Sequence, residues 1–70
     1  MEKEKHIFGK FEIELVFYPV NKKMLCCTFQ NPFVNYKHEK TFLDKDKEKI
    51  IRKIDRQIKD WRKEFFKEDK

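Results

Sequence analysis

Apolar residues return at alternating steps of three and four along the last third of the chain. The repeating set is Ile51, Ile54, Ile58, Trp61 and Phe65. At about 100° per residue, this spacing places the set on one side of an α-helix. Asp44 is a suitable N-cap residue, and no Pro or Gly follows it. The pattern therefore predicts one long amphipathic helix over residues 44–67.

The chain before this helix carries the period of two that is typical of β-strands. Between Lys10 and Tyr18, every second residue is apolar and lies on one strand face: Phe11, Ile13, Leu15 and Phe17. Residues 24–30 form a second apolar run that ends at Asn31-Pro32. Residues 36–42 alternate more weakly and are a candidate third strand.

These elements predict an α+β fold in which the helix covers a small antiparallel sheet of two or three strands. The sheet would occupy residues 10–43, with its Phe11-to-Phe17 face against the helix, and residues 1–5 would be a frayed arm. Seventy residues form a single domain, 1–70. The strict three-and-four spacing also permits a helix–helix dimer. Two heptads are few for a coiled coil, however, and the sheet needs a cover.

A second row of residues follows the helix at the same spacing, on a neighbouring face, and all its members are basic. This basic ridge consists of Lys45, Lys49, Arg52, Arg56, Lys59 and Lys63. Lys37 and Lys40 precede it, and the second half of the chain carries a net charge of +4. Because like charges at these spacings destabilise a helix, phosphates would relieve the repulsion. The ridge therefore predicts sequence-tolerant binding of nucleic acid, either DNA or RNA.

Two other interpretations of the surface remain open. The ridge is a plain solvated face if acids four residues upstream pair with it, as Glu48 does with Arg52 and Asp55 with Lys59. The sheet face away from the helix would carry Glu12 and Glu14, which repel phosphates. Apolar residues left for that face favour a protein partner, in a homodimer or as an inhibitor of a host protein: Val16, Tyr18, Met24 and Phe33.

The sequence predicts a non-enzymatic protein without a metal, a cofactor or a small-molecule substrate. Cys26 and Cys27 are adjacent, so they point to opposite faces of a strand and lack the spacing of zinc ligands, even with His6 and His38. They are expected to be buried, inert thiols. No Ser is present as a nucleophile, and Gly9 alone cannot form a phosphate-binding loop.

Composition also predicts where such a chain belongs. No apolar run is long enough to span a membrane, and the first residues do not form a signal peptide, so a cytoplasmic protein without membrane contact is expected. The residue types that dominate have A/T-rich codons, and Ala and Ser are missing. This bias favours a low-GC genome, a phage or a mobile element.

Overall fold

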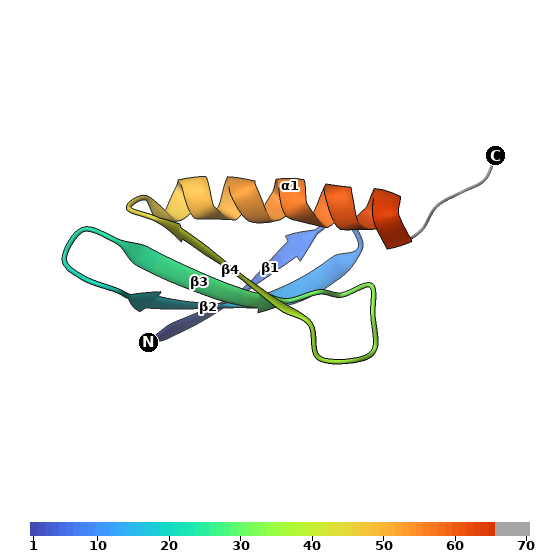
Figure 1. Ribbon diagram of the computed structural model, residues 1–70, viewed down its shortest axis with the longest axis horizontal. Coiled ribbons are helices and arrows are strands. Elements are labelled where there is room, and N and C mark those ends of the chain that lie inside the picture. Colours follow the sequence, from blue (N-terminus) through green and yellow to red (C-terminus); the bar gives the residue numbers. More distant parts are fainter. Residues whose placement is uncertain (66–70) are drawn as a thin grey trace.

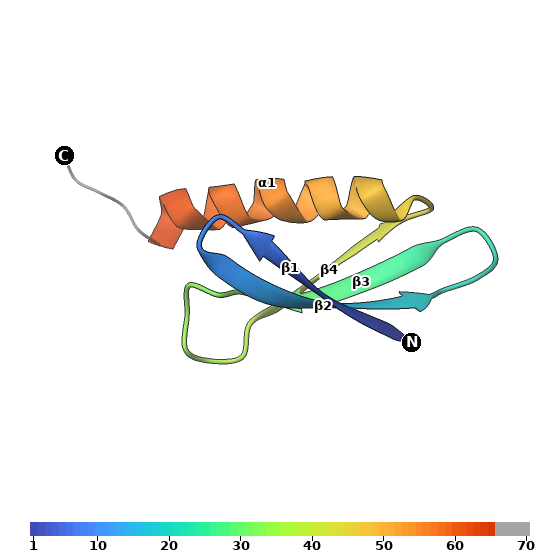
Figure 2. The same cartoon turned by 180° about the vertical axis from the view of Figure 1, so that it is seen from behind.

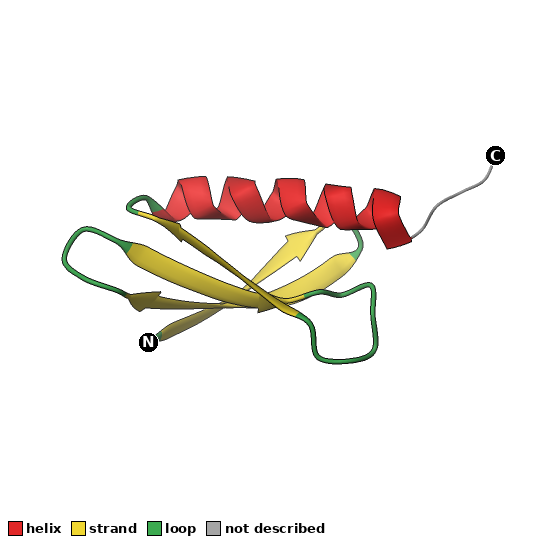
Figure 3. Cartoon of the chain, viewed as in Figure 1, coloured by secondary structure: helices red, strands yellow, loops and turns green. Residues whose placement is uncertain are grey.

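The structure is a computed structural model that describes residues 1–65, and it shows four strands followed by one helix (Figure 1). The elements are β1 (Glu2–Phe8), β2 (Phe11–Pro19), β3 (Leu25–Gln30), β4 (Glu39–Asp44) and α1 (Lys47–Phe65). All neighbouring strands are antiparallel, in the order β1-β2-β3-β4. Helix α1 crosses one face of this twisted sheet, as Figures 2 and 3 also show. The α+β class is confirmed, but the sheet has four strands rather than two or three.

The additional strand is β1, which contains the residues predicted to fray. Its link to β2 is the two-residue turn Gly9-Lys10, where Gly9 has φ +66° and Lys10 has a negative φ. A glycine with positive φ at the first position is typical of a type II′ hairpin turn, which matches the twist of the flanking strands. The positions of β1 that face α1 include Glu4 and His6, so the strand lacks the apolar alternation by which strands are recognised.

Charged contacts replace apolar packing along the first part of β1, and only its last residue, Phe8, joins the hydrophobic core. The Lys47 ammonium donates to the carboxylates of Glu2 at 3.0 Å and Glu4 at 2.5 Å, and it lies 4.7 Å from the centre of the Phe17 ring. The His6 imidazole donates to Glu4 at 2.8 Å. The hydrogen bonds from His6 and Lys47 lower the pKa of Glu4, and those to Glu4 and Glu2 raise the pKa of Lys47.

The predicted inner face of β2 is confirmed. Ile13, Leu15 and Phe17 are at most 5% exposed, and Phe11 is partly buried at the edge of the same cluster. Cys27 and Phe29 of β3 extend this layer beneath the helix. The opposing residues of α1 are Ile50, Ile54, Ile58 and Trp61.

The buried row of α1 differs from the predicted one at both ends. Ile50 is fully buried and Ile51 only partly so, while Phe65 remains 38% exposed. Phe65 is the last residue of α1, and the last turn of this helix extends past the sheet (Figure 1). Because the rest of the row packs on the sheet within one chain, it is not available for the helix–helix dimer.

The helix begins at Lys47, later than predicted, and its N-cap is Asp46 rather than Asp44. Asp46 accepts the Glu48 N–H through Oδ1 at 3.1 Å, and its carbonyl accepts the Ile50 N–H at 3.2 Å. Asp44 ends β4, and its own Oδ1 accepts the Asp46 N–H at 3.1 Å. This Asx-type turn separates strand from helix. The predicted end of the helix at residue 67 lies outside the described residues.

The predicted third strand is β4, but it begins and ends later in the sequence than predicted. It spans Glu39–Asp44 rather than residues 36–42. The preceding loop is held by Asn31, whose side chain is fully buried. Its backbone N–H donates to the His38 carbonyl at 2.8 Å, its Nδ2 donates to His38 Nδ1 at 3.0 Å, and its Oδ1 accepts the Phe33 N–H at 2.8 Å. These hydrogen bonds hold residues 31–38 in a closed loop, so β4 begins only at Glu39.

Candidate nucleic-acid interface

The basic ridge lies on the solvent side of α1. Its five helical members, Lys49, Arg52, Arg56, Lys59 and Lys63, are all exposed. At about 100° per residue, the centre of the ridge is roughly half a turn from the centre of the buried row, so it is opposite that row rather than beside it. The ridge is therefore the part of the helix that projects farthest from the sheet.

Acidic neighbours neutralise only part of the ridge. Lys59 forms an ion pair with Asp55 at 3.2 Å, as predicted, but both side chains are well exposed and the pair contributes little. The predicted pair between Glu48 and Arg52 is not formed. Within residues 1–65, four ridge cations have no carboxylate partner: Lys49, Arg52, Arg56 and Lys63.

Three of the lysines predicted for the nucleic-acid interface lie outside α1. Lys45 precedes α1 and lines a shallow hollow with the β2–β3 turn, beside Lys22 and Lys23. Lys37 is exposed in the loop before β4. Lys40 is exposed on β4, with its ammonium 5.8 Å from the centre of the Phe42 ring. These three lysines are thus separate from the helical row.

The three-and-four spacing missed further cations on α1. Lys47 binds β1, and Lys53 donates to the Leu43 carbonyl at 3.1 Å and pairs with Asp44 at 3.2 Å. The Asp46 N–H and the Lys53 ammonium, as hydrogen-bond donors, lower the pKa of Asp44. Arg62 lines a hollow beside the β1–β2 turn. Only the position of each residue relative to the sheet separates these structural roles from surface charge.

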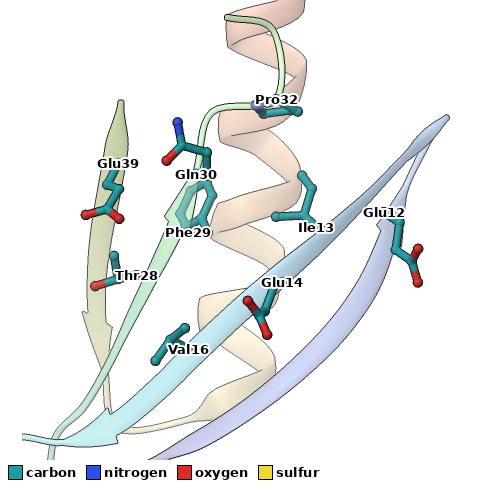
Figure 4. A pocket seen from close by; sticks show the side chains of 9 residues that line it. All are labelled: Glu12, Ile13, Glu14, Val16, Thr28, Phe29, Gln30, Pro32 and Glu39. Carbon is teal, nitrogen blue, oxygen red and sulfur yellow. The ribbon is translucent and has the colours of Figure 1, made fainter. Parts of the chain in front are cut away.

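The sheet face away from α1, called the outer face, carries acids at one end. Glu12, Glu14 and Glu39 line a shallow depression with Thr28 and Gln30 (Figure 4). The same face also carries Lys3 and Lys5 of β1, and Lys5 is opposite Glu14 in the strand register. Three carboxylates therefore outnumber two lysines on the outer face, whereas cations dominate the solvent side of α1. Glu12 and Glu14 are on this face, as predicted; that they repel phosphates stays a prediction.

At the other end of the outer face, a row of hydroxyl side chains lies next to a row that contains apolar side chains. The hydroxyls of Tyr18 and Thr28 are 3.2 Å apart, and those of Thr28 and Thr41 are 3.1 Å apart. In the next row, Cys26 is only 5% exposed and lies between Tyr18 and Leu43, which are 38% and 46% exposed.

The four residues predicted for a protein interface are not brought together. Val16 and Tyr18 are on the outer face, where Val16 is half-buried. Met24 is in the β2–β3 connection. Phe33 packs against the hydrophobic core, with its ring centre 4.8 Å from that of Phe11 in an edge-to-face arrangement. The prediction for Phe33 is therefore wrong, because the loop folds it toward the helix side of the sheet.

The two cysteines are buried free thiols on opposite faces of β3. Burial, the neighbouring Cys26 and the charge of Glu4 raise the pKa of Cys27 to about 11. Because the thiolate is the reactive form and Cys27 is fully buried, we expect Cys27 to react slowly with alkylating agents and oxidants at neutral pH. Among the described residues, no three His, Cys, Asp or Glu side chains gather as a metal-binding group.

No protein-family model, curated protein or solved structure matches the chain. The helix of residues 47–65 is too polar to cross a membrane, and the described part of the chain contains no other helix.

Proposed function

We propose that the protein is a sequence-tolerant nucleic-acid-binding module that uses the solvent side of α1. The observation that carries this proposal is the set of four exposed ridge cations without a carboxylate partner in residues 1–65. Their repulsion destabilises the isolated helix, and a polyanion would relieve it.

The geometry of the ridge suits a phosphate backbone. Lys49 and Lys63 are fourteen positions apart, or about 21 Å along the helix axis. Duplex DNA carries one phosphate charge for about every 1.7 Å of its axis, so each cation on this length has several phosphates within reach. On the outer face Glu12, Glu14 and Glu39 outnumber Lys3 and Lys5, which favours an approach with the helix toward the nucleic acid.

Binding would depend strongly on salt. For duplex DNA, the logarithm of the binding constant falls linearly with the logarithm of the salt concentration. A ridge that contacts about five phosphates, with Lys59 included, gives a slope of roughly −4 to −5. Fluorescence anisotropy of a labelled duplex, titrated with protein at several salt concentrations, measures this slope. The absence of binding at low salt would contradict the proposal.

A second candidate function is self-association or binding of a protein through the outer face. It is favoured by Tyr18 and Leu43, which are exposed on both sides of the buried Cys26. Light scattering over a range of concentrations tests the homodimer form. A dimer that Tyr18→Lys converts to a monomer supports it, and a monomer at every concentration contradicts it.

A further inference from the structure

A hollow with an aromatic wall lies beside the basic ridge, between the β1–β2 turn and the C-terminal half of α1. Figure 2 shows this turn next to the helix. We call this site the aromatic hollow. Its apolar wall is formed by Phe8, Phe11 and Phe33 together with Ile58. Phe11 and Phe33 both line the hollow and are only partly buried.

The size of the aromatic hollow limits what it can hold. Its volume is about 180 Å³. Pockets that enclose whole drug-sized ligands measure roughly 300–1,000 Å³. The aromatic hollow therefore suits one planar ring system with its substituents outside.

Cations surround the aromatic hollow. Lys10, Lys59 and Arg62 line it, and the single carboxylate among its lining residues is Asp55, which is paired with Lys59 at 3.2 Å. The positive excess means that a ligand with an apolar ring and anionic substituents fits best. Lys59 belongs both to this rim and to the basic ridge, so the two surfaces are continuous.

We propose that the aromatic hollow binds one unpaired base of a single-stranded nucleic acid. The base would stack on the ring of Phe11, with Phe33 as the second, edge-to-face wall of the hollow. Its flanking phosphates would contact Lys10 and Arg62, and the strand would continue along the basic ridge. Stacking needs no particular base, because every base has a π-face. This inference rests on the proposed function and adds to it a preference for single strands over duplex, since the bases of a duplex are stacked and unavailable.

The test compares the affinity of the protein for two labelled single-stranded oligomers of twelve nucleotides. One is oligothymidylate, and the other is abasic at every position. Both carry the same phosphates, and only the first has bases. Wild-type protein should bind the thymidylate oligomer about five- to a hundredfold more tightly. Phe11→Leu/Phe33→Leu keeps the apolar wall but removes its two partly exposed rings and leaves only the buried ring of Phe8, so it should abolish this preference and leave binding of the abasic oligomer unchanged.

A matched control and a surface variant guard against loss of folding. Phe42→Leu removes a half-buried ring that stacks on Phe29, 5.7 Å away, and does not line the aromatic hollow, so the preference should persist. Arg62 is exposed, and Arg62→Gln should reduce binding of the thymidylate oligomer more than that of the abasic one. Circular dichroism confirms that each variant is folded.

The outcomes separate the two proposals. Equal binding of both oligomers by the wild type would overturn the aromatic hollow as a base site and leave the proposed function standing. A base preference that survives in folded Phe11→Leu/Phe33→Leu would also overturn it, because the bases would then bind elsewhere. If the wild type binds no oligomer and no duplex at low salt, the proposed function fails, and this inference fails with it.

Discussion

The ammonium of Lys47 is 2.5 Å from the carboxylate of Glu4 and thereby joins the first turn of α1 to β1. The same ammonium lies over the Phe17 ring. Lys47→Met keeps the aliphatic stem but removes both electrostatic contacts. We expect a loss of about 1 kcal/mol in the free energy of unfolding, measured by urea denaturation. Lys49→Met, on the solvent side, is the control; an equal loss in both variants would show that Lys47 does not hold β1.

The same contacts predict a dependence of stability on pH. The pKa of Glu4 is lowered below its ordinary 4.5, because His6 and Lys47 donate hydrogen bonds to its carboxylate. A lowered pKa stabilises the fold above the unfolded-state value, and this contribution disappears as pH falls through the folded-state value. Stability should therefore decrease below about pH 4.5, and the decrease should be smaller in Glu4→Gln. Urea midpoints between pH 7 and pH 3 test this; Glu14→Gln is the control, and identical acid profiles for all three proteins would refute it.

Replacing the helix cap should destabilise the protein more than replacing an acid in the middle of α1. Asp46→Ala leaves the Glu48 N–H without its side-chain acceptor, and such caps contribute about 0.5–2 kcal/mol. Asp60→Ala is the matched control, because Asp60 forms no hydrogen bond or ion pair with residues 1–65. Thermal unfolding followed at 222 nm compares them. Equal midpoints would argue against Asp46 as the N-cap.

The buried amide of Asn31 should be essential for the loop before β4. Asn31→Ala removes the acceptor of the Phe33 N–H and the donor to His38. We expect a loss of about 1–3 kcal/mol in the free energy of unfolding. Because the His38 ring centre is 5.6 Å from that of Trp61, the fluorescence of Trp61 should also change. The exposed Asn35→Ala should have neither effect, and an unchanged Trp61 spectrum in Asn31→Ala would contradict this role.

The sequence predicted the elements whose apolar pattern is regular and missed those held by polar contacts. The alternation from Phe11 to Phe17 identified β2 and its buried face, because that face packs by hydrophobic burial alone. β1 was missed because Glu4 and His6 occupy inward positions. His6 donates to Glu4, and Glu4 depends on Lys47, more than forty residues away. Gly9 was the one local signal, as the first residue of a hairpin turn.

The candidate interface was predictable in kind but not in extent. The three-and-four spacing identified the cations on the solvent side, because helix geometry alone places them opposite the buried residues. It could not separate Lys53, bound to the end of β4, from free surface charge, nor place Lys45 outside α1. The aromatic hollow was invisible because the loop that carries Phe33 depends on the buried Asn31.

The central claim is that the solvent side of α1 binds the nucleic acid, and a comparison of two charge-matched variants tests it most directly. The first replaces Lys49, Arg52, Arg56 and Lys63 with Gln. The second replaces four exposed lysines away from α1: Lys3, Lys5, Lys22 and Lys23. Both variants lose the same net charge. Anisotropy titrations of a labelled duplex at several salt concentrations give, for each variant, the slope of the logarithm of the binding constant against the logarithm of the salt concentration. The account predicts a slope near −1 for the first variant and near −4 for the second. Equal slopes would show that net charge, and not this face of the helix, accounts for binding.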